Sequence, residues 1–385
     1  MKIAACTLSL VVLLVASPAQ SQETRLPAGA APKTAVGKMT GTGHWITDGA
    51  EELKLPHCGP LVRLGDGRLL VISGGRAFAS PDEGKTWEEQ SSLLKDAGQY
   101  AAAVGRSALR TKKGTILVPF MNTKKEKWTW TVEQTDAPGA VLPTCVVRST
   151  DEGKTWLEPQ TLHDDWTGDL SAILQTRSGR IVLTSMRLLH SPGRHTVLTY
   201  YSDDEGATWK SSHVLDLGGS GDHDGTMEAA LEELTDGRLW MLIRTNWDKF
   251  WNAWSDDGGA SWRSIAPSRI DASSSPAFLR RLASGRIALV WNRCRPQNVL
   301  EIARRGGDGQ VSAVPASWHR EELSLALSGD DGRTWTDPVV IARKPGGNVS
   351  YPYLFEPKPG VLWVFAVADG LQVSLQEKDF VVKGP

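Results

Sequence analysis

The stretch SPDEGKTW at Ser80–Trp87 recurs four more times along the chain with small changes. Each copy reads Ser-x-Asp-x-Gly-x-Thr/Ser-Trp. Such a pattern suits a tight β-turn, because Asp can bond to nearby amides, Gly accepts a positive φ and Trp can pack beneath the turn. The later copies are STDEGKTW (Ser149–Trp156), SDDEGATW (Ser202–Trp209), SDDGGASW (Ser255–Trp262) and SGDDGRTW (Ser328–Trp335). Five such copies indicate a repeat protein.

A second repeat precedes the turns, with an apolar strand, a short polar turn ending in Gly and another strand. Apolar alternation around Gly predicts antiparallel hairpins. The serines that open successive turns lie about 50 to 75 residues apart, the size of a four-stranded propeller blade. We therefore predict an all-β, six-bladed β-propeller, with a seven-bladed ring or a sandwich as the alternative. The six hairpins are Leu61–Ile72, Ala108–Phe120, Ile173–Thr184, Leu231–Ile243, Phe278–Trp291 and Leu354–Phe365.

The sixth unit lacks the eight-residue turn, so the outer strand of its blade must come from elsewhere. The C-terminal stretch QVSLQEKDFVV, from Gln372 to Val382, can supply a last strand. Alternatively, GHWITD at Gly43–Asp48 can close the ring from the N-terminal side.

The chain divides into three regions. Residues 1–19 combine Lys2, an apolar run and Ser-Pro-Ala, which predicts a secretory signal peptide. Residues 20–43, rich in Ala, Pro, Gly and Thr, predict a poorly ordered leader. Residues 44–385 form the predicted propeller. Since no later segment is long and apolar enough to span a membrane, we expect an exported protein, periplasmic or extracellular.

Composition excludes several classes of partner. The 43 Lys and Arg residues balance 44 Asp and Glu residues, and no basic block occurs, so neither nucleic acid nor an anionic membrane surface is expected. Cys58, Cys145 and Cys294 are far apart, which allows at most one disulfide and gives no metal-ligand spacing. We expect no cofactor, no metal and a monomer.

Two reactive side chains lie at one level of the predicted channel. The first strand of each propeller blade lines the central channel, so hairpins aligned on their turn glycines show which residues converge there. Nine residues before the glycine, this alignment gives Glu228 in the fourth unit and Tyr351 in the sixth. His57, Arg106 and Asp169 lie within one residue of the same level.

The repeated turn resembles the Asp box of the sialidase (neuraminidase) superfamily, where the boxes are structural and lie away from the active site. That family uses a Tyr nucleophile activated by Glu, three arginines that hold the substrate carboxylate, and an Asp acid/base. Its pattern implies that Tyr351 is the nucleophile, Glu228 its base, and Arg244 and Arg320 are substrate ligands. These roles are chemically coherent, because a phenol needs a base to become a nucleophile and guanidinium groups bind carboxylates bidentately.

The first unit departs from the family pattern. It opens PHCGPLVRLGDG, with His57 where the family has an arginine, and its connection SGGRAFAS contains no Asp. Arg106 and His57 are therefore candidates for the third substrate ligand. Asp136 and Asp169 are candidates for the acid/base, and His57 also suits proton transfer near neutrality.

Structural alternatives accompany these assignments. Glu228 can cap a strand or pair with an arginine of the channel. Arg320 and Asp136 can be solvated surface residues, and Tyr353 competes with Tyr351 for the same side of the strand. The run Asp222-His223-Asp224 fits a solvated turn better than a metal site.

The leading hypothesis is an exported sialidase-like exo-glycoside hydrolase. It would cleave a terminal acidic sugar, sialic acid or a relative, from a glycan with retention of configuration. The alternatives are a glycan-binding propeller without catalysis, or another acidic-sugar hydrolase or lyase.

Overall fold

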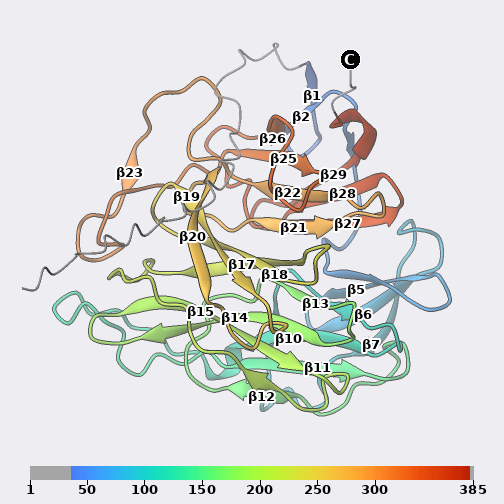
Figure 1. The fold of residues 1–385 in the computed structure, drawn as a ribbon. Coiled ribbons are helices and arrows are strands. Elements are labelled where there is room, and N and C mark those ends of the chain that lie inside the picture. Colours follow the sequence, from blue (N-terminus) through green and yellow to red (C-terminus); the bar gives the residue numbers. More distant parts are fainter. Residues whose placement is uncertain (1–35, 382–385) are drawn as a thin grey trace, which may run out of the picture.

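The computed structural model describes residues 36–381. In this part of the chain, six β-sheets surround a common axis, and the helical structure is limited to the 3-10 turns η1 (Thr123–Lys125) and η2 (Glu377–Asp379). Figure 1 shows the chain passing around the ring in sequence order. The predicted six-bladed β-propeller is confirmed. The predicted signal peptide, 1–19, lies outside the described residues, as does most of the predicted leader.

All six predicted hairpins form the inner strands of successive blades. Each of the first three blades ends in an outer strand that follows an Asp box. Blade one contains β4 (Leu61–Arg63), β5 (Leu69–Ser73), β6 (Arg76–Ser80) and β7 (Glu88–Ser92); blade two contains β8 (Ala102–Val104), β9 (Leu109–Arg110), β10 (Ile116–Asn122), β11 (Thr144–Ser149) and β12 (Gln160–His163); blade three contains β13 (Ile173–Gln175), β14 (Ile181–Leu189), β15 (Arg194–Ser202) and β16 (Lys210–Ser211).

Blades four and five repeat the plan, and blade six borrows its outer strand. The small hairpin β23–β24 extends from the connection between β22 and β25 (Figure 1). Blade four contains β17 (Met227–Glu233), β18 (Leu239–Arg244), β19 (Lys249–Ser255) and β20 (Ser264–Asp271); blade five contains β21 (Phe278–Arg281), β22 (Ile287–Trp291), β25 (Glu322–Ser328) and β26 (Val339–Arg343), with β23 (Arg304–Arg305) and β24 (Ala316–Ser317) between them; blade six contains β27 (Pro352–Lys358), β28 (Val361–Ala366), β29 (Leu371–Gln376) and β3 (Glu51–Glu52).

The N-terminal segment closes the ring, although not through GHWITD. The pair Glu51–Glu52 (β3) bonds to β29 and completes blade six. Within GHWITD, β2 (Trp45–Thr47) instead adds to β26 of blade five, and β1 (Gly37–Met39), inside the predicted leader, pairs with β2. The reason for this placement is burial, since Ile46 is fully enclosed in a core that joins blades five, six and one.

The Asp boxes are hydrogen-bonded turns between the third and fourth strands. In the third box, Ser202 Oγ donates to Asp204 Oδ1 at 2.8 Å, while the amides of Gly206 and Thr208 donate to Ser202 Oγ and Asp204 Oδ1. Gly206 has φ +76°, and a Cβ there would lie 2.3 Å from Leu117 Cδ2. The turn therefore requires glycine on two grounds, backbone conformation and close packing.

The boxes and the level of Tyr351 lie on opposite faces. In an antiparallel blade the first and third strands run in the same direction. Residues at the start of an inner strand therefore face away from the box that follows the third strand. The propeller presents its boxes on one face and the Tyr351 level on the other.

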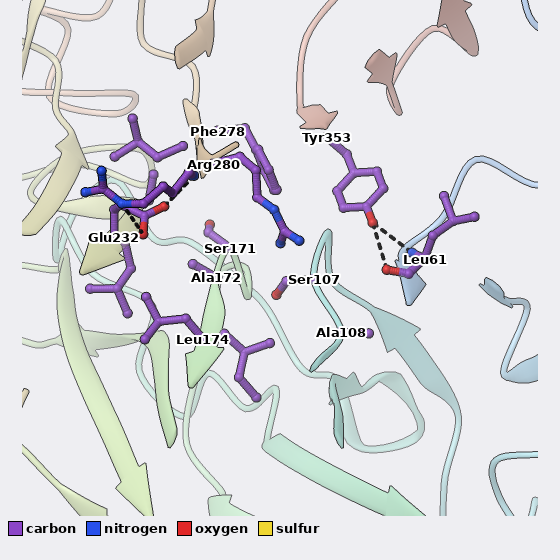
Figure 2. A pocket seen from close by; sticks show the side chains of 15 residues that line it. Leu61, Ser107, Ala108, Ser171, Ala172, Leu174, Glu232, Phe278, Arg280 and Tyr353 are labelled. Carbon is purple, nitrogen blue, oxygen red and sulfur yellow. Dashed lines mark hydrogen bonds and ion pairs between the residues drawn. The ribbon is translucent and has the colours of Figure 1, made fainter. Parts of the chain in front are cut away.

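Tyr353 lines the channel below that level. Its hydroxyl accepts a hydrogen bond from the Leu61 amide at 2.8 Å and lies 3.1 Å from the Leu61 carbonyl, which links blade six to blade one (Figure 2). Inner strands of all six blades line a cavity of about 180 Å³ there, and Arg280 points into it (Figure 2). The position of Tyr353 is thus structural, and only Tyr351 is left at the channel mouth.

Candidate active site

A tyrosine–glutamate pair lies at the centre of the site. Tyr351 Oη donates a hydrogen bond to Glu228 Oε1 at 3.2 Å, although the two residues come from blades six and four. Both have positive φ, +57° for Tyr351 and +32° for Glu228. A register shift between Met227 and Ala230 places Glu228 in a β-bulge. Bulges re-aim side chains, and such conformations persist where the surrounding structure holds them.

Arg244 fixes the other oxygen of Glu228. It ends β18, opposite Met227 in the register, and is only 1% exposed. Its Nη1 donates to Glu228 Oε2, and its Nε and Nη2 donate to Ser274 Oγ at 3.2 and 2.9 Å. The Glu228–Arg244 pair is thus a buried ion pair in which Ser274 accepts two further hydrogen bonds from the guanidinium group.

The charges around the pair decide which of its two groups holds the proton at rest. Burial alone would raise the pKa of Glu228, but Arg244, Arg106 and Arg320 together lower it. The pKa of Tyr351 is raised, first by the negative charge of Glu228 and then by burial. At neutral pH the site therefore holds a protonated phenol beside an ionised carboxylate that can accept its proton.

Arg320 approaches the tyrosine from blade five. Its Nη2 donates to the Ser274 carbonyl at 2.7 Å, and its Cζ lies 5.5 Å from the centre of the Tyr351 ring. Burial, together with the charge of Arg244, lowers the pKa of Arg320. Its Nε is buried without a hydrogen-bond partner in the described structure. This guanidinium group is held in place but not neutralised.

Arg106 supplies a third guanidinium group from blade two. Its Cζ lies 5.4 Å from the Tyr351 ring centre. Its Nη1 donates to the Pro352 carbonyl at 3.2 Å, and its Nη2 donates to Asp169 Oδ2 and Ser171 Oγ, both at 2.9 Å. Arg106, Arg244 and Arg320 therefore surround Tyr351 from three blades.

The other candidates lie elsewhere. His57 stacks on Phe78 with ring centres 4.2 Å apart and meets the edge of Trp87, so its contacts are with blade one. Asp136 accepts hydrogen bonds from His190 Nδ1 at 2.8 Å and from two backbone amides, which ties it to the β14–β15 connection. Neither residue contacts Tyr351 or Glu228 among the described interactions.

The run Asp222-His223-Asp224 lies at the rim of the site. Asp224 is buried and accepts amides from Ser220 and Ala313, while His223 is half exposed and meets the edge of Trp318. Within residues 36–381, no group of three or more His, Cys, Asp or Glu side chains is placed to hold a metal ion. Cys58, Cys145 and Cys294 are free thiols.

Sequence reasoning missed Ser274 and Trp318. The ring centre of Trp318 lies 5.2, 5.8 and 5.5 Å from the Cζ atoms of Arg320, Arg244 and Arg305, within cation–π range. The one available signal was its spacing of two from Arg320, which in an extended segment puts both side chains on one side. Nothing in the local sequence distinguishes Ser274 from Ser273 and Ser275.

Comparison with known proteins agrees with this fold. A model of the BNR repeat-like domain matches residues 139–364, more than half of the chain. The chain belongs to this family. Its ring of blades is the BNR-repeat propeller of the sialidase superfamily, as the Asp boxes implied.

Individual relatives of this BNR protein are distant. A sialidase from Micromonospora viridifaciens is 24% identical over 320 residues, 73% of this chain and 44% of the relative. The chain thus spans less than half the length of that relative. A protein of unknown function from Dyadobacter fermentans superposes with a TM-score of 0.57 at 18% identity, over 85% of this chain and 98% of the other. A Hadza microbial sialidase superposes with the same TM-score and the same identity, over 84% of this chain and 66% of the other. These similarities concern the fold.

Proposed function

We propose that this protein is an exo-acting glycoside hydrolase that removes a terminal acidic sugar, sialic acid or a relative, from a glycan with retention of configuration. The observation that carries the proposal is the hydrogen bond from Tyr351 Oη to Glu228 Oε1 inside a ring of three arginines. The superfamily membership of the chain supports it.

Tyr351 would be the nucleophile and Glu228 its base. As Tyr351 Oη attacks the anomeric carbon, its proton passes to Glu228, which the arginines keep ionised. A carboxylate nucleophile would be repelled by a substrate carboxylate attached to the anomeric carbon, whereas a neutral phenol is not.

The arginines would bind the substrate carboxylate. Arg106, Arg244 and Arg320 face two carboxylates, Glu228 and Asp169, so the cluster has one positive charge in excess. One bound carboxylate would balance it and supply acceptors for guanidinium donors that lack them. The cluster thus favours a sugar with a single carboxylate.

One observation favours the alternative of a glycan-binding propeller without catalysis. Blade one joins β5 to β6 through Gly74 and Gly75 alone, both at positive φ. Such a two-residue turn has no room for the loop that carries the family's acid/base Asp. The lyase alternative has no observation of its own in the site.

Export and a monomeric state stay predictions. The predicted signal peptide lies outside the described residues. Between residues 36 and 381, no helix has the length and hydropathy needed to cross a membrane.

The test is release of the aryl alcohol from an aryl α-sialoside by the purified protein, compared with Tyr351→Phe and the matched control Tyr353→Phe. We expect Tyr351→Phe to lose about a hundredfold or more in kcat, because Phe has no oxygen that could bond to the anomeric carbon. Tyr353→Phe should keep kcat and lose about 1–3 kcal/mol of stability, because Leu61 loses its partner.

Turnover by Tyr351→Phe at the rate of the unmodified protein would contradict the mechanism. Absence of turnover by the unmodified protein, with retained glycan binding, would establish the binding alternative.

A further inference from the structure

The proposed hydrolase lacks a proton donor where its family has one. We propose that Asp169 protonates the leaving oxygen and later activates the attacking water. This inference rests on the proposed function. It assigns a catalytic residue to the same site.

Asp169 has one carboxylate oxygen that is not engaged. It lies at the level where the inner strand of blade three begins, and its side chain is 13% exposed. Its Oδ2 accepts from Arg106 Nη2 at 2.9 Å, and Ser171 Oγ lies 3.4 Å away. Its Oδ1 has no hydrogen-bond partner among residues 36–381. That oxygen is available to a ligand.

The negative charge of Asp169 is close enough to Tyr351 to affect its pKa. Glu228 is the main cause of the raised pKa of Tyr351, and the charge of Asp169 also contributes to it. Asp169 is further tied to Arg106, whose guanidinium carbon is 5.4 Å from the Tyr351 ring centre. The carboxylate thus borders the space in which the anomeric carbon must lie for attack.

The competing donors are already committed. Both oxygens of Asp136 are used, Oδ1 by the Ala137 amide at 2.7 Å and by His190, and Oδ2 by the Ser191 amide at 3.2 Å. Three such bonds hold the carboxylate in place and occupy both of its oxygens. The ring of His57 is stacked on Phe78. Asp169 alone among the candidates combines a free oxygen with a position beside Tyr351.

The two chemical steps balance. In the first, Tyr351 Oη gives its proton to Glu228 and bonds to the anomeric carbon, while the glycosidic bond breaks and its oxygen takes the proton of Asp169. In the second, water attacks the anomeric carbon and gives a proton to Asp169. The bond to Tyr351 breaks, and the phenolate recovers its proton from Glu228. The net reaction consumes one water and restores every group.

The experiment compares two leaving groups. An activated aryl alcohol leaves with little protonation, whereas the lactose of sialyl-lactose needs a full proton. We expect Asp169→Asn to slow sialyl-lactose hydrolysis at least about a hundredfold more than aryl sialoside hydrolysis. Asp136→Asn is the matched control and should slow both substrates equally or not at all. Azide should accelerate deglycosylation of the aryl substrate by Asp169→Gly, since it replaces water without needing a base.

Equal losses on both substrates in a folded Asp169→Asn protein would overturn the acid role. Inactivity of the unmodified protein on every sialoside would overturn the proposed function itself.

Discussion

Replacing Arg320 should stabilise the protein while abolishing its function. The Cζ atoms of Arg320 and Arg244 lie 5.2 and 5.8 Å from the Trp318 ring centre, so they are at most about 11 Å apart. At an effective dielectric constant of about 20, their repulsion is then at least about 1.5 kcal/mol. Burial adds a cost that lowers the pKa of Arg320. Against these costs stand a hydrogen bond to the Ser274 carbonyl, worth about 1.5–3 kcal/mol because its donor is charged, and the smaller attractions of Tyr351 and Glu228, which still leave the pKa of Arg320 lowered.

The matched variant is Arg244→Met. It leaves Glu228 buried and unpaired, and breaking a buried ion pair costs about 3–5 kcal/mol. Arg320→Met instead removes the excess cation, and because Met retains the packing on Trp318, we expect a gain of about 1 kcal/mol. The two substitutions are chemically identical, yet their effects on the free energy of unfolding should have opposite signs.

Thermal unfolding at pH 7 measures the difference. We expect Tm to rise by about 2 °C in Arg320→Met and to fall by about 6 °C or more in Arg244→Met. Both variants should lose aryl sialoside turnover. If Arg320→Met lowers Tm as much as Arg244→Met does, the site does not contain an uncompensated positive charge, and the argument for a carboxylate ligand loses its electrostatic basis.

Two further predictions concern the same cluster. Arg106→Lys should raise KM for a sialoside about tenfold or more in steady-state kinetics. The reason is that an ammonium group cannot keep the three hydrogen bonds that the planar guanidinium group makes to Pro352, Asp169 and Ser171. An unchanged KM would show that Arg106 is not part of the substrate site. The folded pKa of Glu228 lies below its ordinary value of 4.5, so its pairing stabilises the fold above that pH and is lost as pH falls through the lower folded value. Tm should therefore fall more steeply on acidification below pH 4.5 in the unmodified protein than in Glu228→Gln. Parallel plots of Tm against pH for the two proteins would show that ionised Glu228 does not stabilise the fold.

Local patterns predicted the repeated elements well. The Asp boxes and the hairpins depend on contacts between residues a few positions apart, such as the hydrogen bond from the Gly206 amide to Ser202 Oγ. A short stretch of sequence is therefore enough to predict them. Alignment on the turn glycines also placed Glu228 and Tyr351 at one level, because inner strands of equal length start at equal depth. The hydrogen bond that joins them agrees with that expectation.

Other features depended on which distant segments meet. The segment GHWITD matched a closing strand, but burial of Ile46 directs it to blade five, and Glu51–Glu52 closes blade six. Tyr351 and Tyr353 are equivalent in the strand pattern. They differ because the hydroxyl of Tyr353 meets the backbone of Leu61 on the next blade.

The sequence by itself determined the six blades, the turns that join their outer strands and the level at which reactive side chains gather, since each follows from local periodicity. Only the tertiary structure decided that Arg106 of blade two completes the arginine cluster, that Asp169 is left with a free oxygen and that His57 packs away from it. These outcomes depend on long side chains reaching across from neighbouring blades. Packing around the channel determines which groups each guanidinium group contacts, and a local sequence pattern cannot predict this.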